Sequence, residues 1–228
     1  MPPSTEAPDP TGTPAPALTP DPAGAPASSG TAERPEVSSP AEVPSPAEAP
    51  GPTRSGDSGP RRLFVLRHAK SARPEGVPDR DRPLGPRGLR DAPAAGRFLA
   101  EGGGLPDLVL CSPARRARET WGLAAAELER PVATRHDPRL YGADEQDLLE
   151  VLHDVPDEVG TLLIVGHNPG LEDLVMLLAG DSVDDALDRV RTKFPTCALA
   201  VLAWHGTWTD LGPDEALLTE LWTARGSS

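Results

Sequence analysis

The stretch Arg62-Leu-Phe-Val-Leu-Arg67, followed at once by His68, sets the expected fold of this 228-residue chain. Its four consecutive apolar residues are bounded on both sides by arginine. A short apolar run of this kind is typical of a strand that is buried on both faces of a sheet. We therefore expect a buried strand that ends in polar, chemically reactive side chains.

Working outward, similar apolar runs recur along the chain and helical segments separate them. The further expected strands are 108–111, 132–135, 161–165, 198–204 and 216–222, with the last two as a candidate hairpin. The expected helices are 86–100, 112–129, 144–153 and 171–179, with Ser112 as N-cap and Pro113 at the first helical position. Pro93 conflicts with the first half of the first helix. The alternation predicts an α/β fold, a three-layer sandwich with a mostly parallel central sheet.

Residues 1–60 differ sharply in composition from the rest of the chain. They hold 16 of the 29 prolines and none of the 8 aromatic residues. Such a segment cannot bury enough apolar surface to offset the backbone entropy of ordering. We expect a disordered, acidic Pro/Ala-rich tail at 1–60 and one domain at 61–228. The tail is interpreted as a solvated tether or as an interaction or phosphorylation segment, and its partner is unknown.

The charge and the cysteines narrow the class of protein. The formal net charge is −13, and the tail carries 8 acidic and 2 basic residues. This balance argues against a broad basic surface for nucleic acid. Cys111 and Cys197 show no zinc-site spacing, so we expect no metal. There is no secretory signal pattern and no apolar run long enough to span a bilayer, which predicts a cytoplasmic protein without a membrane partner.

Unusual side chains follow three of the expected strands. His68 ends the first, Ser112 follows the second shortly before Arg116, and His167 ends a third. The carboxyl ends of parallel strands lie at one edge of a sheet, where α/β proteins bind ligands. Guanidinium groups match the geometry of phosphate oxygens. An imidazole among cations is held neutral, and such a ring beside a bound phosphoryl group is a nucleophile.

These residues resemble the motifs of a known family, the histidine phosphatase superfamily with its phosphoglycerate-mutase-like fold. The segment 66–69, Leu-Arg-His-Ala, resembles the R-H-G signature, and 112–120 matches the S-x-x-x-R-A-x-x-T pattern. The segment 165–170, Val-Gly-His-Asn-Pro-Gly, is similar to the second-histidine motif. Arg82-Pro-Leu84 with Gly88 resembles a spacer of the short bacterial branch. The resemblance runs from about residue 62 to 204.

The resemblance implies a role for each matching residue. His68 would be the nucleophile that takes the phosphoryl group as a phosphohistidine. Arg67 and Arg116 would clamp the phosphate oxygens, and His167 would complete the pocket and stabilise charge in the transition state. Water would hydrolyse the intermediate, and no cofactor is expected.

The departures from the family pattern concern the general acid. Ala69 stands where the family has Gly, Pro74 where the mutase branch has Asn, and Pro138 where that branch has its acidic Glu. The mutase activity is therefore not expected, and the acid is left open among three carboxylates. These candidates are Asp81, Asp137 and Asp144.

The short domain is most similar to the SixA-type phosphohistidine phosphatases. The resemblance predicts a metal-independent phosphatase acting on phosphohistidine or another phosphorylated protein. Two alternatives stand beside it. One is a small-molecule phosphomonoesterase, and the other is a catalytically weak phosphate-binding interaction module.

Overall fold

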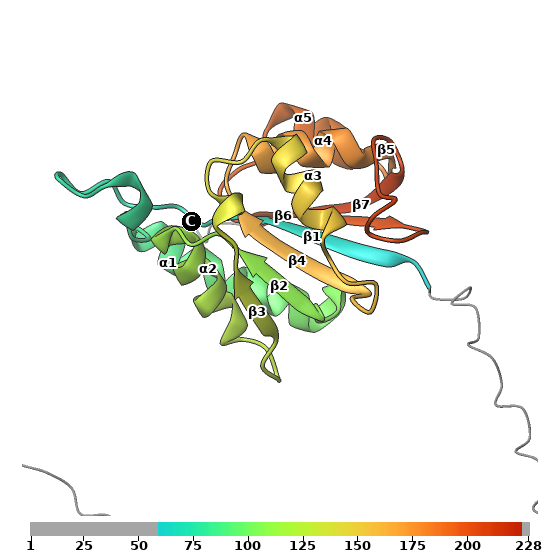
Figure 1. The fold of residues 1–228 in the computed structure, drawn as a ribbon. Helices are drawn as coiled ribbons and strands as arrows, with labels where there is room; N and C mark the ends of the chain where they lie inside the picture. The colour runs from blue at the N-terminus through green and yellow to red at the C-terminus, as the bar shows by residue number, and fades with distance from the viewer. Residues whose placement is uncertain (1–58, 225–228) are drawn as a thin grey trace, which may run out of the picture. The chain divides into compact units, whose positions relative to one another are not determined.

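The computed structural model describes residues 59–224, so the expectation of a disordered tail lies almost wholly outside the described residues. Seven strands form one sheet in the order β3-β2-β4-β1-β6-β7-β5 (Figure 1). The strands are β1 Arg61–Arg67, β2 Leu108–Cys111, β3 Ala133–His136, β4 Thr161–Gly166, β5 Ala179–Ser182, β6 Ala198–Trp204 and β7 Ala216–Thr223. The four from β3 to β1 are parallel, β6 is antiparallel to both neighbours, and β7 and β5 are parallel. The mostly parallel sheet is confirmed.

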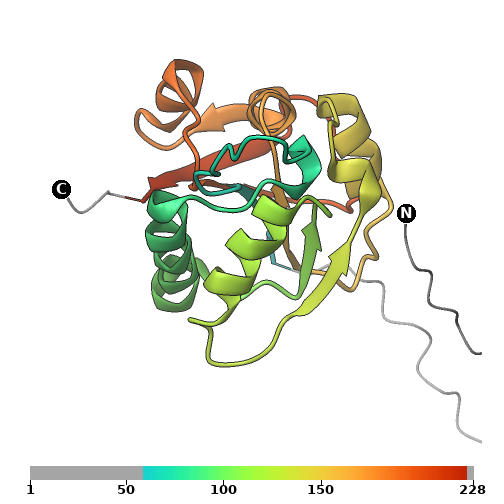
Figure 2. The ribbon, with the colours of Figure 1, turned by 90° about the vertical axis from the view of Figure 1, so that its left-hand side faces the viewer.

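Helices cover both faces of the sheet (Figures 1 and 2). One face carries α1 Pro86–Phe98 and α2 Arg115–Ala125, and the other carries α3 Glu145–His153, α4 Gly170–Leu178 and α5 Ala186–Thr192. The strand β1 supplies both cores: Leu63 and Val65 pack under α3 to α5, whereas Phe64 and Leu66 pack under α1 and α2. Alternate side chains of a strand point to opposite faces, so a continuous apolar run serves two layers. The predicted three-layer α/β sandwich is therefore present.

The register of the parallel strands brings their carboxyl ends level. Arg67 pairs with Gly166, and Cys111 pairs with Val165. The ladder continues one residue further on two strands, because the amide of His68 donates to Gly166 O at 3.0 Å and that of Ser112 donates to Val165 O at 2.9 Å. The three predicted strand ends thus lie at one edge of the sheet, which faces the viewer in Figure 2.

The predicted start of the second helix is wrong. Ser112 does not cap it: α2 begins at Arg115, its N-cap is Ala114, and no side chain caps it. The reason is the bond from the Ser112 amide to β4, which keeps the chain extended there. The helix ends at Ala125, four residues before the predicted end. By contrast, the helix predicted at 86–100 is present as α1, which continues through Pro93.

Two elements near the end of the chain were not predicted. They are the edge strand β5, with the sequence Ala-Gly-Asp-Ser, and the short helix α5. Neither has an apolar run or a long periodic pattern. Of the helices that the structure describes, none has the length and apolar character needed to cross a membrane.

Candidate active site

His68 lies just past the end of β1 and is 9% exposed. Its Nδ1 atom is 2.7 Å from the carbonyl oxygen of Ala69. A carbonyl only accepts, so Nδ1 carries the proton and Nε2 keeps its lone pair. The contact of the other ring nitrogen supports the same tautomer, because the Arg116 Nε–H group donates to His68 Nε2 at 3.3 Å. The ring therefore presents an unprotonated Nε2 atom to the edge of the sheet.

Burial lowers the pKa of His68 from its ordinary 6.5 to about 4. The hydrogen bond to Ala69 opposes this shift, and the charges of Arg116, Arg67 and Arg82 add to it. The sequence predicted a neutral imidazole from neighbouring cations alone. The structure gives the same state with burial as the main cause, since a charged ring loses more solvation than a neutral one.

His167 follows β4, and its ring centroid lies 5.1 Å from that of His68. Its Nε2 atom is 2.8 Å from the hydroxyl of Ser112, which gives that serine a contact at the site rather than a capping role. The Nδ1 atom is buried and has no hydrogen-bond partner among the described residues. Burial, with the nearby His68 and Arg116, lowers the pKa of His167 to about 3. Both rings are neutral at pH 7.

The two predicted phosphate-binding arginines lie near this pair of rings. Arg116 is 7% exposed, sits in the first turn of α2 and contacts His68 through Nε. Arg67 donates from Nη1 to the carbonyl oxygen of Phe194, and its buried Nε has no partner among the described residues. The structure thus brings together all four residues on which the sequence placed the chemistry. Arginine donors beside a neutral imidazole can hold a small oxyanion at Nε2.

A fifth residue, Asp79, was missed by the sequence reasoning. Its carboxylate accepts from Arg82 Nη1 at 2.7 Å, from Arg116 Nη2 at 2.9 Å and from the Tyr141 hydroxyl at 2.9 Å. These donors lower the pKa of Asp79 well below its ordinary range, with the Arg82 bond as the largest cause. The sequence Asp-Arg-Asp-Arg at 79–82 signals only a polar turn, and no local pattern separates Asp79 from Asp81.

None of the three candidate acids has a hydrogen bond to the four site residues. Asp137 binds the Arg139 guanidinium, which lowers the pKa of its carboxyl group. Asp144 caps α3 through the amides of residues 146 and 147. Asp81 is exposed and its side chain has no hydrogen bond to a described residue. The general acid among these three remains a prediction.

The backbone that carries His68 is held from behind by α1 and α2. The amide of Ala69 donates to Thr120 Oγ1 at 3.0 Å, and that hydroxyl donates to the carbonyl oxygen of Arg116. Gly88 of α1 packs against the backbone of Lys70, where an added Cβ would lie 2.3 Å from the carbonyl oxygen. A glycine at this point lets the helix approach the loop closely. The predicted spacer glycine therefore supports the loop that carries His68.

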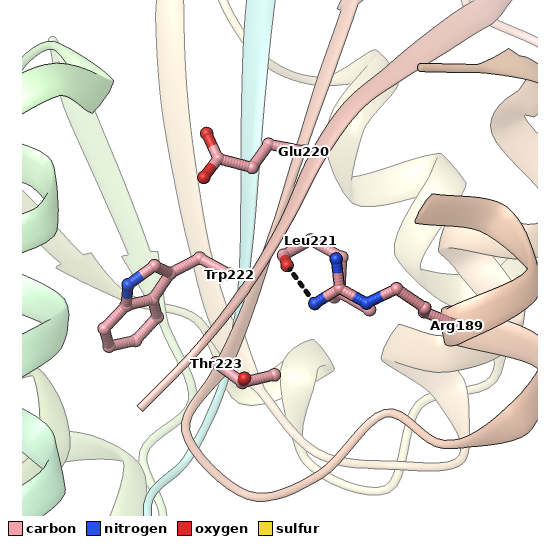
Figure 3. A pocket seen from close by; sticks show the side chains of 5 residues that line it. All are labelled: Arg189, Glu220, Leu221, Trp222 and Thr223. Atoms are coloured by element: carbon pink, nitrogen blue, oxygen red, sulfur yellow. Dashed lines mark hydrogen bonds between the residues drawn. The ribbon is translucent and has the colours of Figure 1, made fainter. Parts of the chain in front are cut away.

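A cavity of about 530 Å³ lies away from these residues, beside β7, and is lined by Arg189 and by residues 220–223 (Figure 3). There Arg189 donates to the carbonyl oxygen of Leu221 at 2.8 Å. It contains none of the four site residues. Within residues 59–224, no three His, Cys, Asp or Glu side chains are grouped so that they could hold a metal ion.

Comparison with known proteins identifies the family of this chain. The model of the histidine phosphatase superfamily (branch 1) matches residues 63–194. An uncharacterized protein of Mycobacterium tuberculosis is 46% identical over 155 residues, which are 67% of this chain and 96% of that protein. A candidate SixA phosphohistidine phosphatase from Nakamurella multipartitia is 33% identical with a TM-score of 0.65, over 74% of this chain and 99% of its own. The corresponding Agrobacterium tumefaciens protein is 28% identical with a TM-score of 0.62, over 73% and 99%.

The family match and these neighbours support phosphatase activity, a hydrolase reaction. The matched segment contains every residue of the candidate site, from Arg67 to His167. The neighbours share nearly their whole length with this chain. The chain therefore belongs to the histidine phosphatase superfamily, in its SixA-type branch.

Proposed function

We propose that the protein is a metal-independent phosphatase that uses His68 as a nucleophile and acts on phosphohistidine or another phosphorylated protein side chain. The observation that carries the proposal is the state of the His68 ring. Its Nδ1–H group is fixed by Ala69, its Nε2 lone pair faces Arg116, and its pKa is about 4. A neutral imidazole with a fixed tautomer can attack phosphorus at neutral pH.

The reaction takes two steps. First, His68 Nε2 bonds to phosphorus while the bond from phosphorus to the substrate nitrogen breaks, and its electron pair stays with that nitrogen. Next, a water oxygen bonds to phosphorus, the Nε2–phosphorus bond breaks and its pair returns to Nε2, and the water proton passes to solvent. Arg67 and Arg116 hold the phosphoryl oxygens, and His167 faces the charge that develops on them, which is the main need in phosphoryl transfer.

The leaving group favours phosphohistidine over a phosphate ester. A substrate imidazole that is protonated on its other ring nitrogen departs as a neutral ring, whereas a serine alkoxide needs a proton from the enzyme. The carboxylate that accepts a hydrogen bond from Arg116, Asp79, is held ionised by Arg82, Tyr141 and Arg116. The neighbours named as SixA phosphohistidine phosphatases support the same substrate class.

The test is a trapping experiment with a matched histidine control. Wild type and the His68→Ala and His136→Ala variants are mixed with a labelled phosphohistidine protein and quenched in alkali. His136 is exposed on β3 and serves as the control. We expect alkali-stable, acid-labile label on wild type and on His136→Ala, and none on a folded His68→Ala variant, which should be inactive. Full turnover by His68→Ala would refute the proposal.

The substrate class is tested by comparing rates. Initial rates are measured side by side on a phosphohistidine protein, a phosphoserine peptide and a panel of sugar phosphates. We expect the phosphohistidine protein to have the highest kcat/KM. A sugar phosphate with the highest value would instead support the small-molecule phosphomonoesterase, and binding of all three without turnover would support the interaction module.

A further inference from the structure

One carboxylate lies among the arginines that face the nucleophile. Asp79 Oδ1 accepts from Arg82 and Asp79 Oδ2 accepts from Arg116 and from Tyr141. The backbone of the same residue also takes part, because Asp79 O accepts from Arg116 Nη1 at 2.6 Å. Both terminal nitrogens of Arg116 therefore bond to one residue. Such a two-point contact resembles the way a guanidinium fork holds a phosphate.

Arg116 is thus engaged before any substrate binds. A guanidinium has five N–H donors. Three of those of Arg116 bond to His68 Nε2, to the backbone oxygen of Asp79 and to Asp79 Oδ2. A phosphoryl group at Nε2 either binds the remaining donors of Arg116 while the Asp79 carboxylate stays in place, or it displaces that carboxylate. In either case the Asp79 charge lies close to the incoming anion and repels it.

The charges near His68 allow the consequence to be stated in simple terms. Three guanidiniums, those of Arg67, Arg82 and Arg116, lower the pKa of His68 and so act on the site electrostatically. Both imidazoles are neutral at pH 7. Asp79 is the carboxylate bonded directly to two of these guanidiniums. Its charge therefore offsets part of the attraction that the arginines exert on a phosphate.

We propose that Asp79 is a positioning residue that holds the Arg82 and Arg116 side chains in place and weakens the binding of inorganic phosphate, so that the product leaves. The inference rests on the proposed function, because it takes Arg116 as a phosphate-binding residue. Without the carboxylate, the same arginines would bind the product phosphate more tightly. The carboxylate thus keeps the guanidinium groups of Arg82 and Arg116 ordered, and the product phosphate still dissociates from the site.

The expected effect follows from Coulomb's law. The Asp79 side chain is 54% exposed, so the dielectric constant of water is the appropriate one. A unit charge at about 5 Å from a doubly charged anion then changes the affinity by about tenfold, and less at high salt. The Asp79→Asn variant keeps the size, an acceptor oxygen for Arg82 and the backbone oxygen that accepts from Arg116. Its NH2 group takes the place of the oxygen that accepts from Arg116 Nη2 and Tyr141, so the variant removes the charge together with that one acceptor.

The experiment measures the inhibition constant for inorganic phosphate against an aryl phosphate substrate at low ionic strength. The variants are Asp79→Asn, Asp79→Glu and Glu75→Gln. Glu75 lies in the turn before the same 3₁₀ helix, is exposed, and has no side-chain hydrogen bond to a described residue, so Glu75→Gln loses the same formal charge four positions away. Thermal unfolding of each variant checks that the fold is retained.

We expect Asp79→Asn to lower the inhibition constant for phosphate about tenfold and to lower KM with it. Asp79→Glu, which restores the charge, and Glu75→Gln should both stay within about twofold of wild type. An unchanged or higher inhibition constant in Asp79→Asn would overturn the inference. Asp79 would then only hold the Arg116 side chain in position. A wild type that neither hydrolyses the substrate nor binds phosphate would instead refute the proposed function.

Discussion

Replacing Gly88 by alanine should disturb the loop that carries His68 more than it disturbs the fold. The new Cβ would lie 2.3 Å from the carbonyl oxygen of Lys70, and that residue follows His68 by two positions. Ordinary van der Waals contact at this point begins at 3.4 Å, so the loop or helix must move by roughly 1 Å. Overpacking of this kind costs about 1–3 kcal/mol in stability. A displacement of about 1 Å beside a reacting atom can lower the rate about 100-fold.

Gly96 of α1 and Gly122 of α2 offer matched controls for this substitution. At Gly96 an added Cβ would lie 2.1 Å from Ala124 O, where α1 packs against α2 away from the strand ends. Gly122 has no atom within 4 Å of a new Cβ, so its alanine variant reports only the gain in helix propensity. We expect Gly96→Ala to lose stability as Gly88→Ala does while keeping kcat/KM, and Gly122→Ala to be stabilised by up to about 1 kcal/mol.

The assay combines thermal unfolding with kcat/KM on an aryl phosphate, measured well below the midpoint of unfolding. The expected pattern is an about 100-fold lower kcat/KM for Gly88→Ala alone. The reasoning is refuted if Gly88→Ala keeps wild-type kcat/KM despite its lower stability. It is equally refuted if Gly96→Ala loses activity to the same extent, because the loss would then reflect general loosening of α1.

The remaining predictions concern the support of the site, its pH dependence and the rest of the chain. Thr120→Val should cost about 1–3 kcal/mol in thermal unfolding, because the buried amide of Ala69 loses its acceptor; an unchanged midpoint would contradict this. His68 should stay neutral at pH 6 in an NMR titration and protonate near pH 4. The folded-state pKa values of His68 and His167 lie below the unfolded value of about 6.5, so stability should fall as the pH drops from 6.5 toward 3; a flat pH–stability curve would argue against buried neutral rings. EDTA should leave the rate unchanged, and strong inhibition would contradict metal independence. Deleting residues 1–58 should not change kcat/KM on an aryl phosphate, whereas loss of folding would show that these residues belong to the domain.

Local patterns in the sequence are sufficient for most of the sheet. The four central residues of β1, Leu63 to Leu66, are all apolar because this part of the strand is buried on both faces, and such a run is visible without a structure. The motifs around His68, Arg116 and His167 also stand directly after strands. Parallel strands bring such positions together by geometry, so the site could be predicted as a group.

Other features depend on contacts between distant segments. Ser112 has the local signs of a helix cap, but its amide bonds to Val165 and its hydroxyl to His167, and both lie about fifty residues away. The short elements β5 and α5 carry no periodic signal because packing against β7 and α4 forms them. Local sequence cannot reveal contacts that exist only after distant segments have come together in the sheet.

The sequence by itself determined the fold class, the family resemblance and the four side chains expected at the edge of the sheet. Only the tertiary structure decided which atom of each is available. The Nε2 lone pair of His68 follows from the carbonyl of Ala69, and its low pKa follows mainly from burial. The place of Asp79 follows from Arg82, Arg116 and Tyr141, which come from three separate segments. Residue types are local, but protonation and charge balance depend on everything that surrounds the group.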